Sequence, residues 1–373
     1  RRSESAEIAD LHLPIKPGSD IALFNGMLHV MIAESLVDQA YVDAHTTGFS
    51  VLADIVKNYP PEKAAEICGI DAAAIVQAAR WFAASGASLS LYCQGLNQSS
   101  HGTHNNAGII HLHLATGQIG KPGAGPFSLT GQPNAMGGRE VGGLSNLMSA
   151  HRDMANPVHR AEMARFWGVP FVPATPGKAA VELFKSLKSG SVKAVWIACT
   201  NPAQSLPNQA AVREALQAAE YVVLQEAYAN TDTADYADLL LPASGWGEKH
   251  GTVTNSERCI SRVLPAVPPP GEARHDWQIV VDFARLLGKK LDQAGVERLF
   301  PYADAEAIFN EHRESTRGRD LDITGLSYEL LESAGPQQWP YPEGATAGKI
   351  RLYEDGIFPT ADGKARFVAI EHL

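Results

Sequence analysis

Apolar and polar residues along this chain repeat with the periods of helices and of buried strands. Residues 20–36, DIALFNGMLHVMIAESL, have apolar positions at helical spacing, and Asp20 stands where an N-cap is expected. Residues 71–86, DAAAIVQAARWFAASG, repeat this plan and stop at Gly86. The run SLSLYC, residues 88–93, then predicts a short strand, and AGIIHLHLATG predicts another helix.

A second cycle of helices and strands follows the glycine-rich middle of the chain. Strands that are apolar throughout and alternate with helices predict parallel sheets covered on both faces. We expect an α/β fold of two Rossmann-like, doubly wound domains with largely parallel sheets, residues 1–150 and 151–373. The expected elements of the second cycle are helix 177–188, strand 192–198, helix 207–218 and strands 221–225 and 238–242.

Polar loops follow four of the predicted strands. In open α/β sheets, ligands bind beyond the carboxyl ends of the strands, where backbone N–H groups and helix N-termini converge. These loops hold amides, hydroxyls and few charges, which suits a large polar ligand with a pyrophosphate, although plain connecting loops are the alternative. The loops read QGLNQ, CTNPAQS, EAYANTDTADYAD and PASGWGEKHGTVTNSER.

Composition narrows the possible partners. The formal net charge of -10 and the pI near 5.7 argue against a nucleic-acid surface. No apolar stretch approaches the roughly 18 residues of a membrane span, so we expect a soluble protein without membrane contact. The segment GKPGAG follows a helix rather than a strand, which disfavours a nicotinamide dinucleotide site.

The four cysteines lie far apart without a C-x-x-C pair. They are Cys68, Cys93, Cys199 and Cys259. This spacing argues against a zinc site or a local iron–sulfur site, and we assign no metal ligand. We expect most of them to be buried thiols in a reducing compartment.

Several long blocks resemble the molybdopterin oxidoreductases of the dimethyl sulfoxide reductase family, and within it the bacterial assimilatory nitrate reductases. They occur in order along nearly the whole chain: RRSESAEIADLHLPIKPGSDIALFNGMLH, QGLNQSSHGTHNNAGIIHLHLATGQIGKPGAGPFSLTGQPNAMGGREVGG, CTNPAQSLPN, NTDTADYADLLLPASGWGEKHGTVTNSER and PGEARHDW. The resemblance implies the central domains of the molybdopterin oxidoreductase fold. It also implies a molybdenum held by two molybdopterin guanine dinucleotides, one in each α/β domain.

The resemblance implies a set of cofactor contacts. For one dinucleotide they are Ser19, Asp20, Gln94 and Gln98, and for the other Asn201, Gln225, Glu226, Lys249 and Asp276. A carboxylate matches the paired N–H donors of guanine, and a lysine can neutralise phosphate. Taken singly, each of these charges is more often a solvated surface residue, and Asp20 is also explained as an N-cap.

The segment FSLTGQPNAMGGREVGG, residues 127–143, resembles the family's backbone beneath the metal, where glycines allow close approach to the pterins. Arg139 is the candidate contact for a planar oxyanion such as nitrate, because a guanidinium offers a planar fork of donors. Met136 and Gln132 are expected beside it. The alternative is an ion pair between Arg139 and Glu140 that only holds the loop.

The implied reaction is reduction of nitrate to nitrite by oxygen-atom transfer, with electrons from a donor protein or reductase subunit. Histidines at 101, 104 and 111 are expected on a polar loop and a helix surface, and no role is assigned to them. The family's [4Fe–4S] domain and C-terminal barrel have no counterpart here, so we expect an internal part of a cytoplasmic enzyme that does not reduce nitrate alone.

Three alternatives stay open at this point. A formate dehydrogenase of the same family would use the same cofactor, although its relatives carry a different run where this chain has GQPNAMGGREVGG. A scaffold homologue that kept the fold and lost the cofactor is the second. A periplasmic nitrate reductase is the third.

Overall fold

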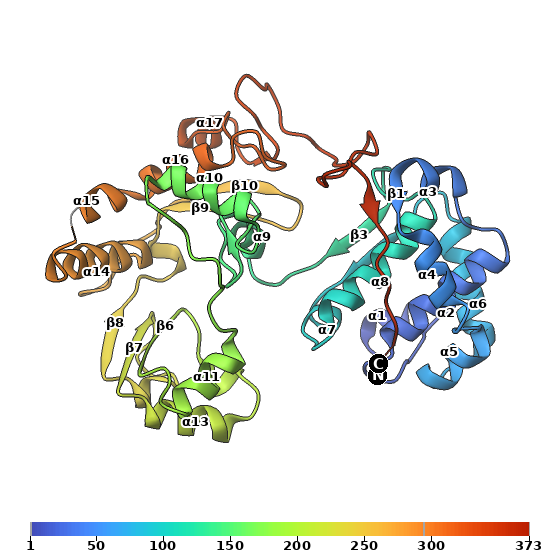
Figure 1. Cartoon of the computed structure of the whole chain (residues 1–373), viewed down its shortest axis with the longest axis horizontal. Coiled ribbons are helices and arrows are strands. Elements are labelled where there is room, and N and C mark those ends of the chain that lie inside the picture. Colours follow the sequence, from blue (N-terminus) through green and yellow to red (C-terminus); the bar gives the residue numbers. More distant parts are fainter. Residues whose placement is uncertain (1, 294, 373) are drawn as a thin grey trace. The chain divides into compact units, whose positions relative to one another are not determined.

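The computed structural model describes residues 2–293 and 295–372, and they form two compact units. One unit contains the chain up to Gln132 together with the segment from Ile350 onward, and the other is Pro133–Lys349 (Figure 1). The division therefore differs from the predicted boundary near residue 150. The reason is that α9 (Ala135–Glu140) is hydrogen-bonded to the second unit, while the C-terminal segment returns to pair with the first.

The first unit is mainly helical. Its core is built around α2, whose Gly26 lies so close to α5 that an added Cβ would stand 2.6 Å from Ala64 Cβ. Two short parallel pairs, β2–β3 and β1–β12, lie beside the helices. The elements are α1 (Glu4–Glu7), α2 (Asp20–Ala33), α3 (Gln39–His45), β1 (Thr46–Thr47), α4 (Phe49–Val56), α5 (Pro61–Cys68), α6 (Ala72–Ala84), β2 (Leu89–Tyr92), α7 (Gln94–Asn97), α8 (Gly102–Ala115), β3 (Gly125–Ser128) and β12 (Ala365–Arg366).

The helix ends of the first unit follow the sequence signals with small shifts. Asp71 caps α6, because its side chain accepts a hydrogen bond from Ala73 N at 2.9 Å. At α2 the N-cap is Ser19 rather than the expected Asp20, which is the first helical residue. The side chain of Asp20 is thus not used as the predicted cap.

The second unit contains the larger sheets. Its elements are α9, β4 (Leu147–Met148), β5 (Arg152–Asp153), α10 (Pro157–Trp167), α11 (Ala180–Lys188), β6 (Ala194–Ala198), α12 (Pro202–Ser205), α13 (Gln209–Ala218), β7 (Tyr221–Glu226), η1 (Ala234–Tyr236), β8 (Leu239–Pro242), η2 (Trp246–Glu248), β9 (Gly251–Thr254), β10 (Cys259–Val263), α14 (Asp276–Lys290), α15 (Val296–Leu299), α16 (Ala305–Ser315), α17 (Tyr328–Ser333) and β11 (Gln337–Gln338).

Strands β6, β7 and β8 form a parallel sheet in that order, as the alternating pattern predicted. Val195, Ile197, Val222 and Leu224 lie in one core with residues of α11 and α13. Helices α11 and α13 are labelled beside this sheet in Figure 1. The other face meets α14, because the Trp196 and Phe283 rings pack edge to face with centroids 4.9 Å apart. Helices thus cover both faces, and the prediction of an α/β fold with mostly parallel sheets is confirmed.

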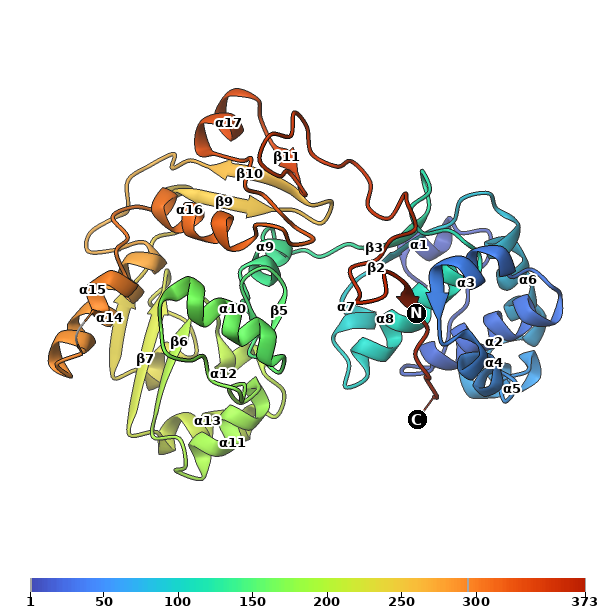
Figure 2. The ribbon, with the colours of Figure 1, turned by 45° about the horizontal axis from the view of Figure 1, so that its top comes forward.

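A three-stranded antiparallel sheet, β9–β10–β11, was not predicted. The sequence predicts a polar loop at residues 251–254, yet they form β9 and pair with β10 (Figure 2). Thr254 lies opposite Ile260. The short run Thr-Val-Thr has only one apolar residue, so its hydrophobicity is too weak to mark a strand. β-branched side chains nevertheless suit a strand that is half buried.

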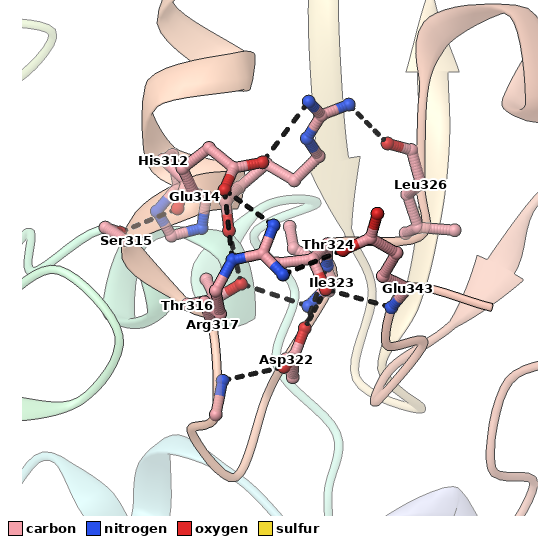
Figure 3. A network of polar contacts seen from close by, with 12 residues as sticks. His312, Glu314, Ser315, Thr316, Arg317, Asp322, Ile323, Thr324, Leu326 and Glu343 are labelled. Atoms are coloured by element: carbon pink, nitrogen blue, oxygen red, sulfur yellow. Dashed lines mark hydrogen bonds and ion pairs between the residues drawn. The ribbon is translucent and has the colours of Figure 1, made fainter. Parts of the chain in front are cut away.

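The turn after α16 is fixed by a dense polar network (Figure 3). Thr316 accepts a hydrogen bond from Ile323 N, and Asp322 accepts from the Thr324 hydroxyl at 2.6 Å. Arg317 joins Glu314 to Glu343 across the turn. Burial alone would raise the pKa of Asp322, but its hydrogen bonds outweigh this and lower it.

No single helix within residues 2–293 and 295–372 is long and apolar enough to cross a membrane. The bent pair α5 and α6 passes that test together, by length and composition only.

Candidate functional site

Three of the four predicted polar loops lie at one edge of the β6–β7–β8 sheet. The strand register pairs Ala198 with Gln225 and Glu226 with Pro242, so the carboxyl ends of the strands are level. The loop after β2 belongs to the first unit instead. In the second unit, the loops that leave β6, β7 and β8 therefore share one rim, as expected for parallel strands.

Asp276 is the centre of a charged cluster at this rim. It begins α14, and its carboxylate accepts hydrogen bonds from Lys249 Nζ at 2.5 Å and Gln225 Nε2 at 2.8 Å. The thiol of Cys199 donates to the same carboxylate at 3.4 Å. The structure thus brings together three of the predicted residues, Asp276, Lys249 and Gln225.

The ionisation of this cluster follows from its contacts. Partial burial would raise the pKa of Asp276, but hydrogen bonds from Lys249 and Gln225 outweigh it, so the pKa is lowered and the group is a carboxylate at neutral pH. Desolvation and the neighbouring Asp276 charge raise the pKa of the Cys199 thiol to about 11. Cys199 is therefore a neutral hydrogen-bond donor here rather than a reactive thiolate.

A cavity of about 470 Å³ opens next to the cluster. The Gln225 side chain is 1% exposed, and its Oε1 atom has no hydrogen-bond partner within the described residues. A buried acceptor without a partner is costly, so this atom fits a ligand that donates a hydrogen bond. The cavity is lined by Trp196, Ala198, Cys199, Gln225, Asp276, Trp277, Val280, Val281, Phe300, Tyr302 and Ile308.

The other two residues predicted for this dinucleotide are engaged elsewhere. Asn201 Oδ1 accepts from Thr233 N at 3.1 Å and from Thr233 Oγ1 at 2.6 Å, which ties the turn after β6 to η1. Glu226 is half-buried and accepts from the N–H of Ala227 at 2.8 Å. Asn201 thus shapes the rim, while Glu226 stands on it at the end of β7.

The residues predicted for the first dinucleotide stand at two places in the first unit. Ser19 is buried and donates to Lys16 O at 2.6 Å, and Asp20 begins α2. Gln94 and Gln98 are exposed around α7, directly after β2. No hydrogen bond joins the two places across the described residues, so their joint use by one ligand stays a prediction.

The three residues predicted to contact substrate fall on both sides of the unit division. Gln132 is exposed and accepts from the Thr130 hydroxyl at 2.8 Å. Met136 is half-buried and Arg139 is exposed, both on α9. The Arg139 guanidinium has no hydrogen bond or ion pair with any residue of 2–293 or 295–372. It is therefore open to a ligand.

The alternative ion pair between Arg139 and Glu140 is absent from the described residues. Glu140 is 3% exposed, and its two carboxylate oxygens accept from Trp339 Nε1 at 2.5 Å and Thr254 Oγ1 at 2.8 Å. Nothing in the sequence pointed to these contacts, because Trp339 is 199 positions away.

Cys199 is a second residue that the sequence prediction missed, although its thiol donates to Asp276. Its position directly after the strand β6 was the signal that could have identified it.

Two expectations about single residues were wrong. Only Cys68 is buried, whereas Cys93 and Cys259 are half-buried and Cys199 is exposed, because these three cysteines lie at the ends of short strands. His101 and His104 are exposed as expected, but His111 is 2% exposed. Its Nε2 accepts from Val368 N, since α8 is covered by the returning C-terminal segment.

Burial of His111 and His113 predicts a loss of stability in mild acid. Burial lowers the pKa of each to about 4, so between pH 6.5 and 4 the unfolded chain binds protons that the folded one does not. Stability is complete above about pH 6.5 and falls by up to about 3 kcal/mol per histidine toward pH 4. Native-state hydrogen exchange of the α8 amides, measured between pH 6.5 and pH 4, reports this loss of stability.

The matched variants are His111→Gln, which keeps an acceptor for Val368, and His104→Gln at an exposed position. We expect the first to reduce the pH slope of α8 exchange and the second to leave it unchanged. Equal slopes in the wild type and His111→Gln would show that His111 is not buried in its neutral form.

This chain is similar to known proteins over most of its length. A family model described as Molybdopterin oxidoreductase matches residues 1–286. A nitrate reductase of Synechocystis sp. is 44% identical over 98% of this chain and 51% of its own length. The assimilatory nitrate reductase catalytic subunit of Bacillus subtilis is 37% identical over 99% of this chain and 51% of its own length.

A solved structure shows the same fold. Acetylene hydratase from Pelobacter acetylenicus matches with a TM-score of 0.69 at 23% identity, over 98% of this chain and 50% of that one. The chain thus spans about half the length of the curated relatives and of the structure it matches.

Proposed function

Because the chain belongs to the molybdopterin oxidoreductase family, which confirms the resemblance of its sequence blocks, we propose that it is part of a molybdenum enzyme that reduces nitrate to nitrite. The family model covers more than three quarters of the chain, residues 1–286. The relatives named nitrate reductase supply the substrate in this proposal. The chain alone, at about half their length, is proposed not to carry out the reaction.

The proposed cofactor is molybdenum bound by two molybdopterin guanine dinucleotides. When bound, it supplies the two-electron chemistry that removes an oxygen atom from the substrate. In the second unit, Asp276 and Gln225 would hold one guanine end, since a carboxylate and a buried carbonyl oxygen accept from N–H groups. Lys249 would keep Asp276 ionised and lie near phosphate.

The proposal depends on one observation, which concerns the rim of the β6–β7–β8 sheet. There an acceptor without a partner, an ionised carboxylate and a cavity meet at the carboxyl ends of parallel strands. An acceptor without a partner beside an ionised carboxylate and a cavity suits a ligand that carries hydrogen-bond donors. This favours the cofactor-binding function over the scaffold alternative.

Arg139 is proposed to bind the nitrate oxygens. It is exposed on α9, and its donors are not engaged by the described part of the chain. A planar, permanently charged fork suits a planar anion and stabilises negative charge as the N–O bond breaks. Met136 on the same helix and Gln132 before it are proposed neighbours of the substrate.

A [4Fe–4S] cluster outside this chain and a donor protein or reductase subunit would deliver electrons. Ser19, Asp20, Gln94 and Gln98 are proposed to hold the other dinucleotide in the first unit. A cytoplasmic location fits a nitrate-assimilating enzyme and is proposed on that basis.

The function is tested by assaying the intact enzyme that contains this chain with reduced methyl viologen. Nitrate is expected to oxidise the dye with formation of one nitrite per two electrons, and formate with oxidised viologen is expected to give no reaction. Formate oxidation without nitrate reduction would replace the proposal by a formate dehydrogenase. Enzyme that is inactive with both, and free of molybdenum, would support the scaffold alternative.

A further inference from the structure

Helix α9 carries both the proposed nitrate contact and a buried carboxylate with no assigned role. Arg139 is exposed, whereas the next residue, Glu140, is 3% exposed. Consecutive residues of a helix point about 100° apart, so the two side chains leave α9 in different directions. We propose that Glu140 is a positioning residue that holds α9, and with it Arg139, in place. This inference rests on the proposed function.

Glu140 anchors the C-terminal end of α9 by three contacts. Its Oε1 accepts from Trp339 Nε1 at 2.5 Å, and its Oε2 accepts from Thr254 Oγ1 at 2.8 Å. Its backbone carbonyl accepts from Ala150 N at 2.8 Å. Both side-chain donors are neutral and both are buried, so the carboxyl group serves as a fixed double acceptor rather than as half of a salt bridge.

Thr254 holds the other end of α9 as well. Its backbone N–H donates to Oδ1 of Asn134, the N-cap residue, at 2.9 Å. One residue of β9 therefore contacts both the first and the last turn of the helix, through its amide and its hydroxyl. A helix of six residues has little stability of its own, so its orientation depends on these two contacts and on Trp339.

This arrangement explains why a buried carboxyl group directly follows the exposed arginine. A contact that binds a small anion must be held within about 0.5 Å of its productive position, and residues on such short elements need supporting hydrogen bonds. Burial raises the pKa of Glu140 and hydrogen bonds from Thr254 and Trp339 partly offset it. Glutamine can therefore replace it, keeping an acceptor for Trp339 and donating to Thr254.

The first experiment measures nitrate kinetics of the intact enzyme with three variants. Glu140→Ala and Thr254→Val are each expected to lower kcat/KM for nitrate about tenfold, since misplacement by about 1 Å can cost up to about 100-fold. Glu140→Gln is expected to stay within about threefold of the wild type. The matched control is Thr324→Val, which removes another buried hydroxyl that donates to a carboxylate, that of Asp322. It is expected to change kcat/KM less than twofold.

A double-mutant cycle separates positioning from general damage. In an Arg139→Ala background, Thr254→Val is expected to have no further effect on kcat/KM, because the residue that it positions is gone. An additive tenfold loss would overturn the proposal. If Arg139→Ala alone leaves nitrate kinetics unchanged, the proposed role of Arg139 fails first, and this outcome is distinct from the failure of the anchor.

The second experiment does not depend on activity or on bound cofactor. Hydrogen exchange is measured for the amides of α9 in the 373-residue chain. Thr254→Val and Glu140→Ala are expected to speed α9 exchange at least tenfold, whereas Glu140→Gln and Thr324→Val leave it within twofold. Unchanged α9 exchange in Glu140→Ala would show that the carboxyl group does not hold the helix.

Discussion

Replacing Arg139 by alanine in the intact enzyme is expected to lower kcat/KM for nitrate by about 100- to 1000-fold. The guanidinium is exposed on α9 and makes no ion pair within the described residues, so it is free to bind an anion. It would contribute in the ground state by binding nitrate and more strongly as charge develops on the departing oxygen. The loss is therefore expected in both KM and kcat. Steady-state kinetics with reduced viologen measure it.

Two variants make the Arg139 result specific. Arg139→Lys keeps the charge but loses the planar fork, and it is expected to recover only about tenfold of the loss. Arg165→Ala removes another exposed arginine, from α10, and is expected to leave the kinetics within twofold. An Arg139→Ala enzyme with wild-type kcat/KM for nitrate would refute the proposed contact.

The parallel sheet could be predicted because the central residues of β6 and β7 are apolar and are buried or half-buried between helices. Residues 194–198 and 221–226 are apolar nearly throughout, and the helices between them carry clear apolar stripes. The antiparallel strand 251–254 could not be predicted in the same way. Its stability comes from pairing with β10, and a partner contributed by another part of the chain leaves no local pattern.

The part of the candidate site that could be predicted is the part that the order and direction of the parallel strands determine. Parallel neighbours have level carboxyl ends, so Cys199 directly after β6 had to lie beside Gln225 near the end of β7, and its N–H donates to the Gln225 carbonyl oxygen at 3.1 Å. The hydrogen-bond partner of each polar side chain could not be predicted from the sequence. Asn201 bonds to Thr233, and Glu140 bonds to Trp339, because packing between distant segments decides which polar groups find partners.

The largest expected effect on cofactor retention comes from Asp276. Asp276→Ala is expected to reduce the molybdenum and guanine nucleotide content of the purified intact enzyme at least about tenfold. The physical reason is that hydrogen bonds to a charged group contribute about 1.5–3 kcal/mol each, and a carboxylate can accept two from guanine. Elemental analysis and nucleotide release after denaturation measure both contents.

Asp282→Ala is the matched control, because Asp282 lies on the same helix and its carboxylate pairs with the exposed Arg274 at the surface. It is expected to keep full cofactor content. Lys249→Met separates binding from folding, since it removes the partner of Asp276 and leaves the carboxylate in place. If Asp276 serves only as the partner of Lys249, then Asp276→Ala and Lys249→Met will destabilise the second unit alike, and both enzymes will retain molybdenum and nucleotide. That outcome would remove Asp276 from the proposed guanine site, whereas loss of nucleotide in Asp276→Ala at unchanged stability would place it there.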